Sequence, residues 1–193
     1  MKNILIISGP TGSGESTVTD LLRQKYPIFK RLVTATSRRP RLHEKNGRDY
    51  FFFTKKQFKQ NIANGQILEF TYIKNRNTYY GTYLPDLKKK LKAGYNVIAN
   101  TDYIGTEFYK KNYGAIGIFI KPESLAAIKK RLLARQPNLA ADELKKRLAN
   151  AQAEIKREEK YYSYTVFNRQ NRLPETIGAI TKILKKEGYR LKK

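Results

Sequence analysis

One short segment near the N-terminus limits this chain to a small set of folds. Residues 3–8 form a brief apolar run, and the glycine-rich segment GPTGSGES follows at residues 9–16. A helix is predicted from about residue 16 to residue 25, with Pro27 ending it. A buried strand, a glycine-rich turn and a helix in this order match the phosphate-loop pattern G-x-x-x-x-G-K-[ST] at all but one position. The segment therefore predicts an α/β fold that binds a nucleotide phosphate.

The chemistry of this loop depends on its backbone N–H groups and on the hydroxyl of Ser16. Glycines let backbone N–H groups converge on phosphate oxygens, and the helix N-terminus adds a favourable dipole. Ser16 occupies the position where a hydroxyl would hold Mg²⁺. We expect the ATP phosphates to be bound by Gly9, Thr11, Gly12, Ser13, Gly14, Ser16 and Thr17.

The one departure from the pattern is Glu15, which stands where the motif has lysine. A pair of unit charges at 4 Å is worth about 4 kcal/mol near a protein surface. Reversing the sign of one charge, even when discounted for screening, lowers rate or affinity on the order of a thousandfold. Two arrangements would soften this loss. Glu15 could turn to solvent, or it could share Mg²⁺ with Ser16.

Composition points to anionic partners and excludes several kinds of metal site. Lys and Arg number 40 against 16 Asp and Glu, which gives a net charge of +24. Such an excess predicts non-specific association with polyanions, although a solvated basic face is the more common reason for it. Cysteine is absent and His43 is the one histidine, so thiolate metal sites and histidine relays are excluded. The longest later apolar run, residues 115–120, is far too short to span a membrane. We expect a soluble cytoplasmic protein, and the pattern carries no signal of an oligomeric state.

The remaining chain alternates between predicted strands and helices, with a β-rich insert between residues 32 and 84. Buried apolar strands that alternate with helices favour a parallel sheet flanked by helices. Strands are predicted at 3–8, 31–35, 50–53, 67–73, 78–83, 96–101, 115–120 and 164–168. Helices are predicted at 16–25, 54–64, 84–93, 122–135, 142–161 and 174–186.

A second group of residues suits a nucleoside monophosphate. Arginines in the segment TSRRPR, residues 36–41, can grip one phosphate bidentately. Tyr50 and the tyrosines of YYGT, residues 79–82, add hydroxyl donors. Glu69 is an isolated carboxylate in basic surroundings, which suits the adjacent N1 and N2 donors of guanine. The alternative for a lone carboxylate of this kind is a structural ion pair.

Several motifs together resemble the guanylate kinase family over nearly the whole chain. The segments are GPTGSG (9–14), TSRRPR (36–41), NGRDYFF (46–52), ILEF (67–70), YYGT (79–82), KRL (130–132) and KRLANAQAE (146–154). The resemblance implies a P-loop nucleoside monophosphate kinase fold in one domain. Its core would be 1–33, 84–135 and 148–193, its GMP-binding insert 34–83 and its helical lid 136–147. It also implies the reaction ATP + GMP to ADP + GDP, with Mg²⁺.

The resemblance also implies roles for individual residues. Phosphate contacts of GMP would come from Arg38, Arg41, Tyr50 and Tyr80, and guanine contacts from Thr34, Glu69, Thr82 and Asp102. Arg135 and Arg147 would close over the transferring phosphoryl group. Arg131 and Asn168 would lie near the adenine.

A second departure from the family pattern is Asn100, at a strand end that usually carries an acid for the Mg²⁺ water shell. Both departures fall on the ATP half, whereas the GMP half keeps its residue types. The sequence therefore predicts GMP binding with reduced phosphoryl transfer. The alternatives are a non-catalytic module that binds GMP or a phosphorylated or polyanionic partner, and a nucleic-acid-associated protein.

Overall fold

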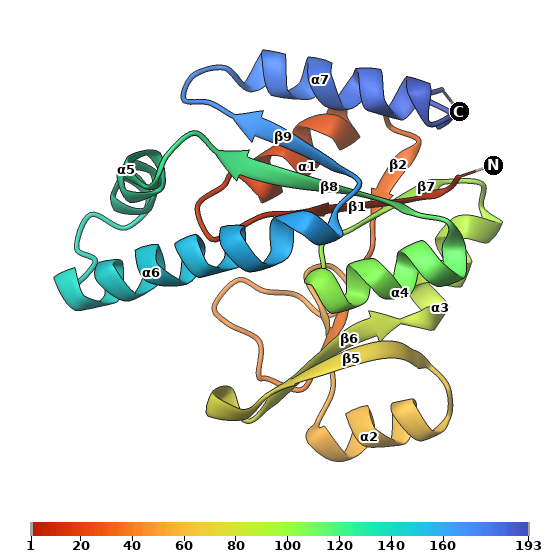
Figure 1. The fold of residues 1–193 in the computed structure, drawn as a ribbon. Coiled ribbons are helices and arrows are strands. Elements are labelled where there is room, and N and C mark those ends of the chain that lie inside the picture. The colour runs from red at the N-terminus through yellow and green to blue at the C-terminus, as the bar shows by residue number, and fades with distance from the viewer. Residues whose placement is uncertain (1, 193) are drawn as a thin grey trace.

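Five parallel strands form the central sheet of the computed structural model, which describes residues 2–192 (Figure 1). The parallel sheet and its flanking helices confirm the predicted fold class. Strand order is β2-β7-β1-β8-β9. The strands are β1 (Ile4–Ser8), β2 (Phe29–Arg31), β7 (Asn96–Ala99), β8 (Ile116–Pro122) and β9 (Tyr164–Asn168).

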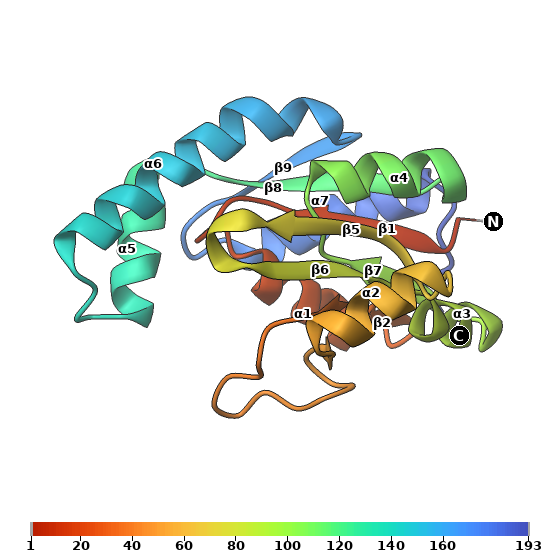
Figure 2. The same ribbon diagram turned by 90° about the horizontal axis from the view of Figure 1, so that it is seen from below.

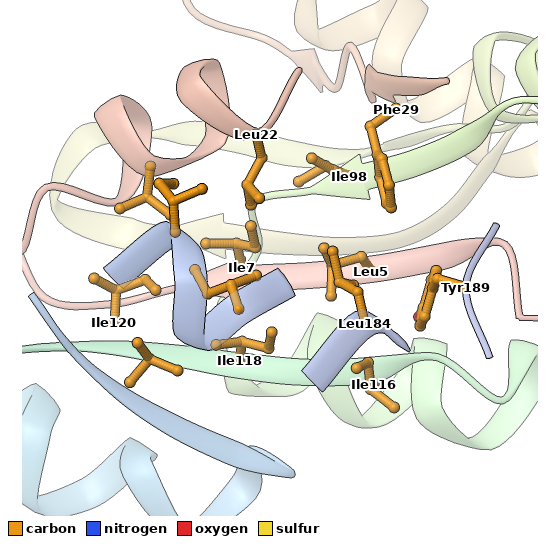
Figure 3. Packing of buried hydrophobic residues seen from close by; sticks show 14 of the residues in the cluster. Leu5, Ile7, Leu22, Phe29, Ile98, Ile116, Ile118, Ile120, Leu184 and Tyr189 are labelled. Carbon is orange, nitrogen blue, oxygen red and sulfur yellow. The ribbon is translucent and has the colours of Figure 1, made fainter. Parts of the chain in front are cut away.

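Helices bury both faces of this sheet. Packed against one face are α1 (Glu15–Lys25) and α7 (Leu173–Lys186). Against the other face lie α3 (Leu84–Lys92), α4 (Tyr103–Tyr113) and α6 (Ala141–Glu158). Because successive side chains of a strand point to opposite faces, β1 contributes Leu5 and Ile7 to one core and Ile4 and Ile6 to the other. Figure 3 shows Leu5 and Ile7 packed between Leu22 of α1, Leu184 of α7 and the neighbouring strands.

A smaller sheet sits beyond the β2 and β7 side of the core and carries its own helix (Figure 1). Its order is β4-β3-β6-β5, with β3 (Ala35–Thr36), β4 (Phe51–Phe52), β5 (Ile67–Ile73) and β6 (Thr78–Tyr83). A 3₁₀ turn (Lys74–Arg76) joins β5 to β6. A capping box of Thr54 and Gln57 is present at the start of α2 (Lys55–Ala63). Phe58 of α2 is fully buried against Ala35 and Ile67, so the small sheet has a core of its own.

The single strand predicted at 31–35 was wrong, because the chain changes sheets there. Its first part ends β2 of the central sheet, and Ala35 begins β3 of the small sheet. Between them the backbone N–H of Val33 donates to the carboxylate of Asp86 on α3 at 3.0 Å. The carbonyl of Thr34 accepts from the N–H of Phe51.

One further boundary and one whole helix differ from the predictions. Pro122 ends β8, and α5 (Leu125–Arg135) begins only after Ser124, whose hydroxyl accepts from the N–H of Ala127. Helix α4 was not predicted, although Asp102 caps it by accepting from the N–H of Gly105 at 3.0 Å.

Helices α5 and α6 pack together and project from one end of the central sheet (Figure 2). The lid expected at 136–147 corresponds to the connection between these two helices and the first turns of α6. Helix α6 continues unbroken to Glu158 and is followed by a 3₁₀ turn (Glu159–Tyr161). Between residues 2 and 192 we find no helix long and apolar enough to cross a membrane.

Candidate functional site

The glycine-rich loop borders a cavity of about 770 Å³ at the N-terminus of α1. The loop's positive φ angles are carried by glycines, with 83° at Gly12 and 89° at Gly14, where side chains would be strained. The predicted phosphate-binding residues all line this cavity, namely Gly9, Thr11, Gly12, Ser13, Gly14, Ser16 and Thr17. The structure therefore brings the loop together as one concave surface.

Two side chains hold this loop through hydrogen bonds to its backbone carbonyls. Arg131 of α5 donates from Nη1 to the carbonyls of Gly12 and Ser13, at 3.2 and 3.0 Å. Asn168 of β9 donates from Nδ2 to the same Ser13 carbonyl at 2.7 Å. A Cβ at Gly14 would lie 2.3 Å from that Nδ2. Asn168 is only 3% exposed, and its side chain supports the loop.

Glu15, the first residue of α1, does not turn to solvent. Its side chain lines the large cavity and is partly buried. Burial raises the pKa of Glu15 from 4.5 to about 7. A hydrogen bond with Asn100 and the positive charge of Arg31 oppose this rise in pKa, and the charge of Glu154 adds to it. The first of the two arrangements that would soften the sign reversal is therefore not adopted.

Asn100 lies against Glu15, so the two positions expected to depart from the family pattern are neighbours. In addition to facing Glu15, its Nδ2 donates to the carbonyl of Ile7 at 3.0 Å and lies 3.3 Å from the Thr19 hydroxyl. These bonds fix the amide at the carboxyl end of the central sheet. A neutral amide thus faces the carboxyl group of Glu15.

The predicted lid arginines line the same cavity as the loop. Arg147 on α6 donates from Nε to Glu143 at 2.8 Å and from Nη1 to Gln136 at 3.0 Å. Arg135, at the end of α5, has no ion-pair or hydrogen-bond partner within residues 2–192. Opposite the loop, Glu154 of α6 is partly buried, and burial raises its pKa.

A second cavity, of about 390 Å³, lies between the small sheet and the carboxyl ends of the central strands. Its walls include most residues predicted to bind GMP, namely Thr34, Arg38, Arg41, Tyr50, Glu69, Tyr80 and Asp102. Four residues border both cavities, namely Arg41, Asn100, Thr101 and Asp102. The two cavities are therefore neighbours with a shared wall.

Arg38 is held in the second cavity by a carboxylate that the sequence did not single out. Its Nη1 and Nη2 contact the two oxygens of Glu44 at 2.6 and 2.7 Å. Glu44 also accepts from the N–H of Arg41 at 2.7 Å, and these bonds lower its pKa to about 2. Tyr50 lies under the guanidinium, 5.0 Å from ring centroid to Cζ. The Nε atom of Arg38 is buried and has no hydrogen-bond partner in the described part of the chain.

Glu69 and Thr82 meet at the other side of this cavity. The Thr82 hydroxyl donates to Glu69 Oε1 at 2.7 Å and lies 2.7 Å from the hydroxyl of Tyr109. Thr82 is 1% exposed and does not line the cavity itself. The pKa of Glu69 is raised, and burial of the carboxyl group is the largest cause. Tyr109 was missed with the rest of α4.

The chain is similar to known guanylate kinases over nearly its whole length. A protein-family model described as "Guanylate kinase" matches residues 1–187. A guanylate kinase of Protochlamydia amoebophila is 36% identical over 191 residues, which is 99% of this chain and 94% of that protein. A guanylate kinase of Helicobacter pylori is 38% identical over 184 residues, covering 94% of this chain and 87% of that protein. The crystal structure of guanylate kinase from Anaplasma phagocytophilum superposes with a TM-score of 0.72 at 26% identity, covering 98% and 87% of the two chains.

Proposed function

Because this chain belongs to the guanylate kinase family, we propose that it binds GMP in the smaller cavity and ATP in the larger one. The Arg38 and Arg41 guanidinium groups would bind the GMP phosphate, with Tyr50 and Tyr80 alongside. Arg41 supports this arrangement, because it borders both cavities. A phosphate held there would lie beside the phosphates of a nucleotide on the loop. Such positioning supplies much of the catalysis of phosphoryl transfer.

The residues around the loop fit a magnesium nucleotide. Within residues 2–192 there is no cluster of three acids or histidines for a fully protein-bound metal. Mg²⁺ instead keeps several waters and takes one or two protein groups with the substrate phosphates. The exposed hydroxyl of Ser16, at the start of α1, offers one such group. When bound, Mg²⁺ would neutralise charge on the phosphates.

We further propose that phosphoryl transfer is reduced, and one observation carries this proposal. A partly buried carboxyl group, Glu15, occupies the loop position of the usual lysine and faces the neutral Asn100. The loop backbone, Arg135 and Arg147 would still stabilise the transferring group, so a weakened rather than abolished reaction is the expected outcome.

Binding and turnover must be measured separately to test this proposal. Calorimetry with GMP alone and with ATP alone reports the two cavities, and a coupled assay of ADP formation reports transfer. We expect measurable GMP binding and slow turnover. Absence of GMP binding would remove the whole proposal, whereas turnover of tens per second, a rate ordinary for kinases, would remove the claim of reduced transfer.

Three variants locate the cause of reduced transfer. Glu15→Lys restores the positive charge, Asn100→Asp restores the acid, and the double variant restores both. Because the two side chains face one another, we expect their effects on turnover to be non-additive, with the largest gain in the double variant. Arg39→Lys, a substitution on an exposed loop residue, serves as a charge-preserving control.

A second candidate function is a non-catalytic module that binds GMP or a phosphorylated or polyanionic partner. The same contact between Glu15 and Asn100 favours it, since both changes act on the ATP side. It predicts GMP binding without ADP formation, and no gain of turnover in the double variant.

A further inference from the structure

A buried chain of hydrogen bonds runs from helix α4 to the wall of the smaller cavity. The hydroxyl of Tyr109 lies 2.7 Å from Thr82 Oγ1, which donates to Glu69 Oε1 at 2.7 Å. Tyr109 and Thr82 are 0% and 1% exposed, whereas Glu69 borders the cavity. The chain thus connects the core of the molecule to β6 and then to β5.

The direction of each proton in this chain follows from the groups themselves. An ionised carboxylate can only accept hydrogen bonds, and a hydroxyl has one proton to give. Thr82 gives its proton to Glu69, so it must accept from Tyr109. Both hydroxyl protons are therefore committed to hydrogen bonds inside the protein.

This arrangement leaves Glu69 as a fixed acceptor facing the cavity. A fixed, ionised carboxylate is complementary to two adjacent N–H donors, which guanine has at N1 and N2. Adenine presents one acceptor and one donor at its N1 and N6. A protonated carboxyl group could satisfy that edge, because it carries one donor as well as acceptors.

We propose that Tyr109, acting through Thr82, is a positioning residue that holds Glu69 ready for guanine and disfavours adenine. This inference rests on the proposed binding of GMP in the smaller cavity. The same helix begins at Asp102, whose Oδ1 caps the helix and whose Oδ2 lies 3.4 Å from the Thr71 hydroxyl. Asp102, at the start of α4, therefore borders the cavity, and Tyr109, seven residues later, contacts Thr82 in the buried interior.

The protonation of Glu69 offers a readout that a purely structural role would not move. Burial and the charge of Asp102 raise the pKa of Glu69, and the bond from Thr82 opposes that rise. Without the Tyr109 hydroxyl, the Thr82 bond weakens, since linked hydrogen bonds polarise one another. The charged or titratable groups that face Glu69 or line the same cavity are Asp102, Tyr109, Arg38, Arg41, Arg76, Tyr50 and Tyr80.

The test compares Tyr109→Phe with Tyr113→Phe by calorimetry of GMP and AMP from pH 5 to pH 8. Tyr113 is a matched control, because it lies on the same helix with its ring 5.6 Å from that of Tyr109 and contacts neither Thr82 nor Glu69 through a hydrogen bond. For Tyr109→Phe at pH 7 we expect the Kd of GMP to rise about fivefold, with a smaller change for AMP. The pH below which GMP binding weakens should also move upward. Tyr113→Phe should leave all three quantities unchanged.

Distinct results separate failure of this inference from failure of the proposed function. If the unsubstituted protein does not bind GMP, both fall. If it binds GMP and Tyr109→Phe has the same GMP-to-AMP preference and pH profile, only the role of Tyr109 falls. An equal loss of GMP and AMP affinity would also overturn it, because a general disturbance has no base preference. Should Tyr109→Phe fail to fold, Thr82→Val carries the same test, and we expect its loss of preference to be larger.

Discussion

The partly buried carboxyl group of Glu15, at the start of α1, gives a prediction about stability that needs no substrate. Burial raises the pKa of Glu15 from 4.5 to about 7 in the folded protein. Between these two pH values the unfolded chain has lost the Glu15 proton and the folded chain still holds it. Stability therefore falls as pH rises through this window, with no effect below it and the full loss above it. The pKa difference corresponds to roughly 3 kcal/mol.

Glu15→Gln removes this titration while keeping the shape of the side chain. We expect its unfolding free energy relative to the unsubstituted protein to increase between pH 4.5 and pH 7, by up to roughly 3 kcal/mol, and to be constant outside that range. Urea unfolding across pH 4 to pH 8.5 measures the difference directly. All other groups titrate in both proteins, so their contributions cancel. Glu107→Gln is the control: it removes an exposed carboxylate that pairs with Lys110 and should change stability by less than about 1 kcal/mol.

The same titration should appear in nucleotide binding. A neutral Glu15 does not repel the ATP phosphates, whereas the ionised form does. The ratio of the Kd of ATP for the unsubstituted protein to that for Glu15→Gln should therefore rise from pH 6 to pH 8, and the ionisation of ATP itself cancels in this ratio. A stability difference that is constant with pH, together with a constant Kd ratio, would refute the claim that Glu15 is buried and protonates near neutral pH.

Three further substitutions test other parts of the site. Glu44→Gln should weaken GMP binding several-fold and leave ATP binding unchanged, because Arg38 loses the carboxylate that holds its Nη1 and Nη2. Tighter GMP binding would show instead that Glu44 competes with the phosphate for Arg38. Gly14→Ala should destabilise the fold by about 1–3 kcal/mol, since φ is 89° and the new methyl would meet Asn168, and thermal unfolding beside Gly178→Ala, in a helix with open space, measures this. Phe58→Ala should cost about 3–5 kcal/mol in the small sheet and reduce GMP binding more than ATP binding, which calorimetry would contradict by finding equal losses.

Local patterns predicted the part of the fold that carries the phosphate loop. The apolar run of β1, the glycines after it and the helix that follows are adjacent in the sequence, so their order alone indicated strand, turn and helix. The strands β5 and β6 were predicted for the same reason, and they pair in the structure as neighbours in sequence and in space.

The errors came from elements whose partners lie far along the chain. Residues 31–35 look like one strand, but their backbone divides between two sheets, and Asp86 on a distant helix takes the N–H between them. Helix α4 has no clear apolar periodicity in its sequence. Its buried residues are Gly105, Thr106 and Tyr109, whereas Ile104 is 47% exposed. A helix that buries small and polar groups lacks the apolar periodicity by which amphipathic helices are predicted.

The same distinction explains which site residues the sequence could supply. Arginines and a carboxylate that face a ligand are chosen for their chemistry, and residue type in a spaced motif indicates them. The groups that hold them in place, Glu44 for Arg38 and Tyr109 with Thr82 for Glu69, are fixed by distances that only the folded chain defines.

Glu15 and Asn100, the two positions expected to depart from the family pattern, lie together in space, and this bears on the proposed ATP site. A lysine at position 15 would meet an acid at position 100 as opposite charges, whereas Glu15 here meets a neutral amide that can donate a hydrogen bond to it. An aspartate beside Glu15 would place two like charges in a partly buried pocket, which raises the cost of ionising either. Asn100 avoids that repulsion while its Nδ2 still donates to the backbone of β1. Exchanging Glu15 alone for lysine therefore leaves the new cation facing an amide rather than a counter-ion. We expect that both positions must be changed together to place a lysine beside an acid in the larger cavity, as the family pattern implies.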